Sequence, residues 1–193
     1  MKSLERVLVS ALVVFYLTVS CASAEYIFDD VDTLRGINKL FLFVNSLPPE
    51  ALKLGFTQEK IQSDVSAALQ AAGIATVTYN ECCDTPGAPY LFVGIGMVPD
   101  SRCNGYAATV HLELRQVANL EREPELSYHA TTWTRGQTIV VEEQMAEQAV
   151  QKLLRSWIGM FIYDHQSVNR ESKLLPPQGG LPPQGGSFRG QGS

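Results

Sequence analysis

The sequence predicts a two-layer α/β (α+β) sandwich, with a mixed sheet of about five strands covered on one face by two helices in the order β-α-β-β-β-β-α. Three observations indicate this fold class. A strand, a helix and a strand follow one another over residues 40–79; three segments of alternating polarity follow between residues 90 and 138; and a long amphipathic segment comes last. We therefore expect a single globular domain over residues 25–172.

The first strand is expected over residues 40–44, where the run Leu-Phe-Leu-Phe-Val is continuously apolar. Such a run is typical of a strand covered on both faces, so we expect it near the centre of the sheet. Pro48 and Pro49 end it, because proline cannot donate to a β-ladder. Thr57 then offers an N-cap hydroxyl to a helix with apolar residues at helical spacing, which ends at Gly73.

Four further strands are expected, over residues 74–79, 90–98, 107–117 and 126–138. The first of these follows the helix at once, which favours a right-handed βαβ unit. A turn-rich stretch over residues 80–89 comes next. The glutamate-rich segment 118–125 is predicted to be a long hairpin loop.

The strongest helical signal covers residues 142–165, whose apolar stripe is expected to lie on the sheet. Gly159 lies within the stripe, so we expect the helix to approach a strand closely there. From Lys173 the composition changes, and the hexapeptide Leu-Pro-Pro-Gln-Gly-Gly occurs twice, at 175–180 and 181–186. Residues 173–193 are therefore predicted to form a disordered tail. This tail is either a flexible extension or a proline-rich ligand for a partner.

The first 24 residues have the features of an export signal. Lys2 and Arg6 give a basic start, residues 7–19 are apolar, and the triplet Ala-Ser-Ala at 22–24 is a cleavage site. The apolar run is too short for a permanent membrane span, and no later segment is long enough. We expect a secreted or periplasmic mature chain without a transmembrane span.

Cys21 provides an alternative to simple cleavage. It closes the string Leu-Thr-Val-Ser-Cys, which is similar to a bacterial lipoprotein signal in which the cysteine is acylated. A lipidated product would stay anchored to a membrane, whereas a cleaved product would diffuse.

Composition excludes several function classes. The formal net charge is −5, which argues against a nucleic-acid partner, because neutralising phosphates requires a basic face. No His-x-His, His-x-x-x-His or Cys-x-x-Cys element is present, so neither a metal nor another cofactor is expected. No nucleophile, base and orienting group stand in a recognisable pattern, which favours a non-enzymatic protein.

Three cysteines follow the signal: Cys82, Cys83 and Cys103. In an oxidising compartment they predict one disulfide and one remaining thiol, with Cys83 and Cys103 as the candidate pair. The strand between them would place the two loops toward opposite ends of the sheet, so one loop would have to fold back.

The candidate binding residues are Trp133, Arg135 and Phe92. Trp133 and Arg135 lie in a threonine-rich strand, where a tryptophan either anchors a protein or glycan partner or belongs to the core. Phe92 precedes Gly94 and Gly96, which leave one strand face without side chains. Either a helix or an aromatic ring packs over that bare backbone, or a shallow apolar pocket beside Phe92 admits a ligand.

The three histidines are assigned mainly structural roles. His111 and His129 fall on paired strands and would approach each other if the register allowed, but a solvated face is the simpler interpretation. His165 is explained by interaction with the negative end of the last helix.

Several short strings resemble a family of small exported bacterial proteins of uncharacterised function. These strings are 47–51 with 55–57, 64–74, 112–116, 130–133, 161–164 and 168–169. The resemblance spans roughly residues 34 to 169. It implies export and the extent of the domain, and it brings no catalytic residues. The tail and the Cys82-Cys83 doublet lie outside the pattern.

The sequence thus predicts an exported, non-enzymatic cell-envelope protein that binds another macromolecule, an envelope protein or a glycan. The alternative is a small-ligand carrier or enzyme that uses a pocket near Gly94 and Gly96. In that case Cys103, His111 or His129 would be its polar participants.

Overall fold

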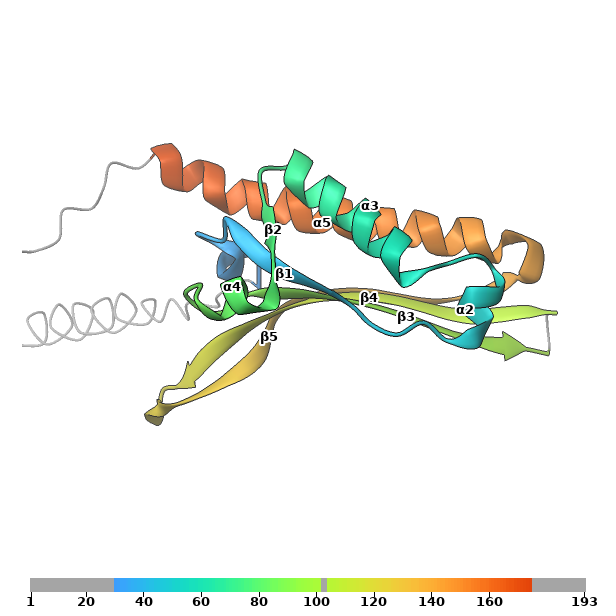
Figure 1. Cartoon of the computed structure of the whole chain (residues 1–193), viewed down its shortest axis with the longest axis horizontal. Helices are drawn as coiled ribbons and strands as arrows, with labels where there is room; N and C mark the ends of the chain where they lie inside the picture. Colours follow the sequence, from blue (N-terminus) through green and yellow to red (C-terminus); the bar gives the residue numbers. More distant parts are fainter. Residues whose placement is uncertain (1–29, 102–103, 175–193) are drawn as a thin grey trace, which may run out of the picture.

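The structure, a computed structural model, describes residues 30–101 and 104–174, with side chains as far as Arg170 (Figure 1). The predicted signal peptide, Cys21, Cys103 and the repeat tail lie outside the described residues. The strands are β1 (Lys39–Val44), β2 (Ala75–Val77), β3 (Tyr90–Asp100), β4 (Gly105–Leu120) and β5 (Glu123–Glu142). The helices are the 3₁₀ helix η1 (Asp30–Leu34), α2 (Pro49–Lys53), α3 (Gln58–Ala71), α4 (Tyr79–Cys83) and α5 (Glu143–Leu174).

The predicted fold class is confirmed. One mixed sheet has the strand order β2-β1-β3-β4-β5, in which β1 is parallel to β2 and β3 while β3, β4 and β5 are antiparallel. The long helices α3 and α5 lie on the same face of this sheet (Figure 1). The core forms between the helices and that face, and it includes Leu42, Val93, Leu112 and Phe161.

Helix α3 begins and ends for the expected reasons. The Thr57 hydroxyl accepts a hydrogen bond from the Lys60 amide at 3.2 Å, and Gly73 adopts φ +84° just after the helix. Ile61, Val65 and Leu69 are buried, which is the helical spacing read from the sequence.

The first strand was expected to be covered on both faces, and this is wrong. Its burial alternates: Leu40, Leu42 and Val44 are buried, whereas Phe43 is 40% exposed and Phe41 is only partly covered. The two long helices of the described residues, α3 and α5, lie on the other side of the sheet, so neither of them covers Phe41 and Phe43.

Two segment boundaries and one expected packing contact also differ from the prediction. Strands β4 and β5 continue almost to the turn, so the predicted loop 118–125 is a tight hairpin whose glutamates face solvent on an edge strand. Helix α5 runs to Leu174, because Val168 is buried and Asn169 bonds to η1. Gly159 does not approach a strand: apart from the adjacent backbone of its own helix, no atom lies within 4 Å of a Cβ added there, and the residue borders a cavity between α3 and α5.

No helix of the described residues combines the length and the apolar character that crossing a membrane requires.

Candidate binding surface

The sheet face that turns away from α3 and α5, which we call the open face, carries aligned aromatic side chains. Phe41 of β1 is opposite Tyr90 of β3, and Phe43 is opposite Phe92. The register continues these two rows into β4, where polar side chains stand beside the aromatic ones. We call the six residues the open-face cluster: Phe41, Tyr90, Arg115, Phe43, Phe92 and Glu113.

Arg115 is fixed over an aromatic ring in this cluster. Its guanidinium carbon lies 4.8 Å from the ring centroid of Phe92, and its Nη2 and Nε donate to Glu113 Oε2 at 2.6 and 2.8 Å. The Tyr90 hydroxyl, at 3.4 Å from Nη1, and then the Glu113 carboxylate raise the pKa of Arg115 above its ordinary value. The open face therefore carries a permanent, positioned cation beside partly exposed rings.

At the α4 end of the open face the rings border a cavity of about 450 Å³, which we call the aromatic groove. Its lining residues are Phe41, Phe43, Tyr79, Cys82, Cys83, Ala88, Tyr90 and His129. The Tyr79 ring stands at 78° to that of Phe41, with centroids 5.8 Å apart, and the His129 ring stands at 66° to that of Tyr90 at 5.5 Å. The edge-to-face pairs give the groove steep aromatic walls.

The short helix α4 positions one wall, and a capping box holds its start. The Thr78 amide donates to Glu81 Oε2 at 2.9 Å, and the Glu81 amide donates to Thr78 Oγ1 at 3.4 Å. The bond from the Thr78 backbone lowers the pKa of Glu81 below its ordinary value. The buried Cys82 thiol donates to the Pro89 carbonyl at 3.2 Å, which ties α4 to the segment before β3.

The groove also has polar atoms at its rim. Tyr79 is 65% exposed, and Cys83 is an exposed free thiol. A hydrogen bond with the Cys83 side chain, followed by the charge of its thiolate, raises the pKa of Tyr79. Burial is the main reason that the pKa of Cys82 is raised, so the exposed Cys83 is the accessible thiol of the pair.

The pocket predicted beside Phe92 at Gly94 is filled by a ring. Gly94 and Gly136 stand opposite His111 on its two neighbouring strands. A Cβ at Gly94 would overlap the His111 imidazole, which stacks on Phe92 with ring centroids 5.4 Å apart. Phe92 itself belongs to the open-face cluster, but it does not border a free cavity at the glycines.

Trp133 is not an exposed anchor, which corrects its assignment as a binding residue. Only 1% of it is exposed, its ring contacts Phe161 edge to face at 5.1 Å, and its Nε1 donates to Asp164 at 3.0 Å. The indole therefore belongs to the core, as the alternative interpretation held.

The Arg135 side chain also makes its contacts within the fold. Its guanidinium lies over the Trp133 ring at 4.9 Å, and it pairs with Asp30 at 2.5 Å and with Asp164 at 3.3 Å. These contacts join η1, β5 and α5, so Arg135 serves the packing of the helical face rather than presenting a free charge.

The polar participants of the alternative function do not converge. His111 is opposite Gly136, whereas His129 is opposite Val117, so the two histidines lie six residues apart along β4, roughly 20 Å. Cys103 lies outside the described residues. Groups of three or more side chains suited to a metal ion are absent from the described part of the chain.

His165 lies inside α5 rather than near its end, so the helix-terminus explanation is wrong. It is 7% exposed, and its Nε2 lies 2.5 Å from the Ile37 carbonyl, while its buried Nδ1 has no partner. The ring serves to hold α5 against the segment before β1.

The candidate disulfide between Cys83 and Cys103 stays a prediction, because Cys103 lies outside the described residues. Cys83 itself is an exposed thiol at the end of α4.

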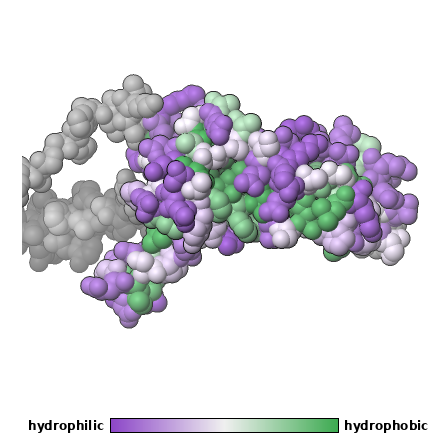
Figure 2. All heavy atoms as spheres, in the orientation of Figure 1, coloured by the Kyte–Doolittle hydropathy of each residue, from purple (hydrophilic) through white to green (hydrophobic). Residues whose placement is uncertain are grey.

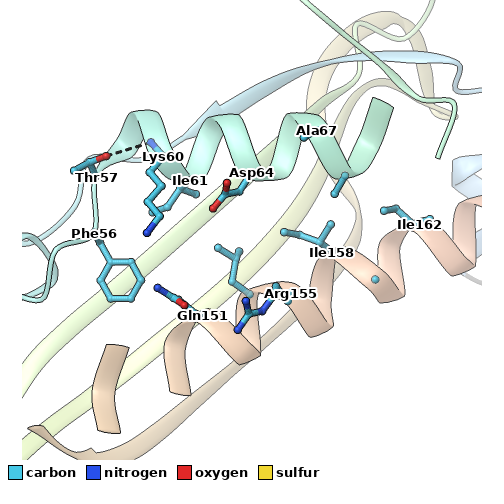
Figure 3. A pocket seen from close by; sticks show the side chains of 13 residues that line it. Phe56, Thr57, Lys60, Ile61, Asp64, Ala67, Gln151, Arg155, Ile158 and Ile162 are labelled. Atoms are coloured by element: carbon cyan, nitrogen blue, oxygen red, sulfur yellow. Dashed lines mark hydrogen bonds between the residues drawn. The ribbon is translucent and has the colours of Figure 1, made fainter. Parts of the chain in front are cut away.

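A second cavity, of about 610 Å³, lies between α3 and α5 (Figure 3). Phe56, Ile158 and Ile162 give it apolar walls, and the polar side chains of Lys60 and Arg155 come from opposite helices. Figure 2 shows hydrophobic residues reaching the surface between the helical layer and the sheet, with polar residues around them.

Comparison of the chain with protein-family models and with curated proteins finds no match. The resemblance to small exported bacterial proteins therefore stays a prediction, and the candidate surface rests on the geometry of this chain.

Sequence reasoning found Phe92 but missed most of the open face. Phe41 and Phe43 were expected on a strand covered on both faces, Tyr90 at the start of the strand 90–98, and Tyr79 at the end of the strand 74–79, whereas Tyr79 begins helix α4. The sequence signal that could have located the open face was the alternation of side chains along β1. Phe41 and Phe43 share one strand face, and Leu40 and Leu42 share the other.

Proposed function

We propose that this chain is an exported, non-enzymatic cell-envelope protein that binds another macromolecule through the open face of its sheet. The partner chemistry that this surface fits best is that of a protein. The observation that carries the proposal is the open-face cluster, in which partly exposed rings and one fixed arginine lie on the face that α3 and α5 leave uncovered.

Residue type and exposure support a protein partner. Aromatic residues and arginine are enriched at the centres of protein interfaces, because they bury large areas at low cost in side-chain entropy. Phe43 is 40% exposed and Tyr79 is 65% exposed, so a partner would bury substantial apolar area here. Glu113 already pairs with Arg115, so burial would not strand a single charge.

Export is the second part of the proposal and is tested by mass spectrometry of the native protein. Removal of the predicted signal peptide would leave Glu25 as the first residue, in a secreted or periplasmic chain. A diacylglyceryl group on Cys21 would instead identify a membrane-anchored lipoprotein. A soluble cytosolic chain that still begins at Met1 would overturn the proposal of export.

Partner binding is tested by placing a photo-reactive phenylalanine analogue at Phe92 in the full chain and irradiating intact producing cells. The matched control carries the analogue at Met160 of α5, which is 37% exposed. We expect a discrete protein adduct from position 92 and not from position 160, weakened by Arg115→Ala. Adducts of equal yield at both positions, no adduct at 92, or an adduct only with glycan would contradict a protein partner on this face.

The small-ligand alternative keeps one supporting observation, the cavity between α3 and α5. Its volume falls in the range of about 300–1,000 Å³ typical of small-ligand sites. An apolar fluorescent probe would bind this cavity if it is a carrier site, and Gly159→Leu would reduce the binding by filling space. Equal binding by the variant and the unmodified chain would remove this alternative.

A further inference from the structure

We propose that the aromatic groove binds proline-rich segments in the polyproline II conformation, and that its occupant is residues 181–186 of this chain's own tail. This inference deepens the proposed function and rests on it, since the groove is one end of the open face. The bound segment would be the second copy of Leu-Pro-Pro-Gln-Gly-Gly.

The groove has the shape and chemistry that proline-rich segments require. Proline-rich peptides dock on grooves with aromatic walls, because their extended conformation is preformed and little entropy is lost on binding. Here the upright rings of Tyr79 and His129 stand beside Phe41 and Tyr90, around a cavity of about 450 Å³. No Asp, Glu, Lys or Arg lines the cavity, and residues 181–186 carry no charge.

Hydrogen bonding at the rim complements the backbone of such a segment. A polyproline II helix forms no internal hydrogen bonds, so its carbonyl groups need outside donors. The exposed side chains of Tyr79 and Cys83 lie at the rim and share a hydrogen bond, so the one that accepts in this bond keeps its own hydrogen for a carbonyl of the segment. The leucine and the two prolines would then face the rings.

The tail leaves the fold at the end of the sheet where the groove lies. His165 bonds to the Ile37 carbonyl, and Asn169 bonds to the Leu34 carbonyl at 3.1 Å, so the last turns of α5 are fixed beside the start of β1. Phe41 lies four residues beyond Ile37 in the sequence, which corresponds to roughly 13 Å along the strand. Figure 1 shows the end of α5 and helix α4 at the same end of the molecule.

Chain length selects the second repeat. From Asn169 the helix continues five residues to Leu174, roughly 8 Å. Passing from the helical layer to the open face adds about 10 Å, and the distance along β1 adds roughly 13 Å. With roughly 8 Å of helix, the path from Asn169 to the groove is roughly 30 Å. At about 3.1 Å per residue the first repeat, 175–180, covers roughly 19 Å, and both repeats cover roughly 37 Å.

Because residues 181–186 are covalently attached to the fold, they would occupy the groove more readily than a separate proline-rich protein. A segment on a short flexible linker experiences an effective concentration in the millimolar range, so even a weak contact is populated. The first repeat would serve as that linker.

The experiment compares two matched variants of the chain with its complete C-terminus by NMR relaxation. In the unmodified chain we expect backbone order parameters above about 0.6 for Gly185 and Gly186. Pro182→Ala with Pro183→Ala should lower them below that value and shift the ring signals of Tyr79 and Tyr90. Pro176→Ala with Pro177→Ala makes the same chemical change in the first repeat and should leave the order of the second repeat in place.

A second pair of variants tests the groove. Tyr79→Ser should release the tail, whereas Tyr163→Ser, at a 73% exposed tyrosine on α5, should not. His129→Ser, on the opposite wall, gives an independent test if α4 loosens when Tyr79 is replaced. Unchanged amide signals of α3 and α5 would show that each variant keeps its fold.

Four results would overturn the inference. The first two are that Gly185 and Gly186 are as mobile as residues 190–193 in the unmodified chain, and that the two proline pairs have equal effects. The third is that the groove variants do not release the tail. The fourth is that the order of the tail disappears on dilution, which would identify a second copy as the partner. The cross-linking experiment reads partner contact at Phe92 and not tail motion, so the proposed function can fail or hold independently of this result.

Discussion

The two faces of the sheet use aromatic residues in opposite ways. On the helical face Trp133 is 1% exposed, hydrogen-bonded to Asp164 and stacked under Arg135. On the open face Phe43 and Tyr79 remain 40% and 65% exposed, although they too have aromatic neighbours. A polar partner beside an aromatic ring therefore does not indicate whether the ring belongs to the core or to the surface. An arginine lies over a ring on both faces, but among the described residues the long helices α3 and α5 cover only one of them.

The largest contrast should appear on truncating one ring from each face. Trp133→Ala should lower the free energy of unfolding by about 3–5 kcal/mol, because it leaves a cavity in the core. Phe43→Ala should cost about 1 kcal/mol, because its ring is already partly in water. Urea denaturation of both variants measures the difference, and similar losses would mean that the open face is as well packed as the core.

The glycines of β3 offer a sharper comparison within the open face. Gly94→Ala should destabilise the chain by about 1–3 kcal/mol, because the added methyl group must displace the His111 ring. Gly96→Ala is the matched control, since its Cβ would meet only Thr109 Cβ at 3.7 Å. Thermal unfolding separates them, and equal midpoints would show that His111 moves aside without cost.

On the helical side a third glycine should respond in the other direction. Gly159→Ala should raise the free energy of unfolding by about 0.5–1 kcal/mol, because alanine favours a helix interior and no atom lies within 4 Å of its new Cβ. Chemical denaturation checks this gain. A loss of stability would mean that the cavity between α3 and α5 closes onto position 159.

The smallest effect concerns pH at the α4 wall of the groove. Because the folded pKa of Glu81 is lowered, its stabilising contribution is complete above the ordinary glutamate value of about 4.3 and is lost as pH falls through the folded pKa. Amide signals of Thr78 and Glu81 should therefore shift on acidification. Glu81→Gln should abolish the shift at Thr78, and its persistence in the variant would assign the titration to another group.

The sequence predicted the layers of this fold better than it predicted which side chains of the sheet are exposed. Helix α3 was predictable because Thr57, the apolar spacing and Gly73 are local signals. The exposure of Phe41 was not, because it depends on where α5, more than a hundred residues later, comes to lie. Alternation shows which residues share a strand face, but only the tertiary structure decides which face is covered.

The same limit explains the errors at Trp133 and His165. Trp133 faces α5 through the register of β4 and β5, where Leu114 is its partner before a bulge. His165 bonds to Ile37, a residue 128 positions earlier. Neither contact has a local signature, so residue type alone suggested a surface anchor and a helix-end charge.

Strand β5 is an edge strand of the sheet and spans twenty residues, Glu123–Glu142. A border strand of that length offers backbone amides and carbonyls to any extended chain that meets it, including another copy of this protein. Leu126 and Tyr128 on it are about half exposed, which would strengthen such pairing. The carboxylates of Glu121, Glu123 and Glu125 lie at its hairpin end, and their like charges would disfavour the pairing of two identical edges there.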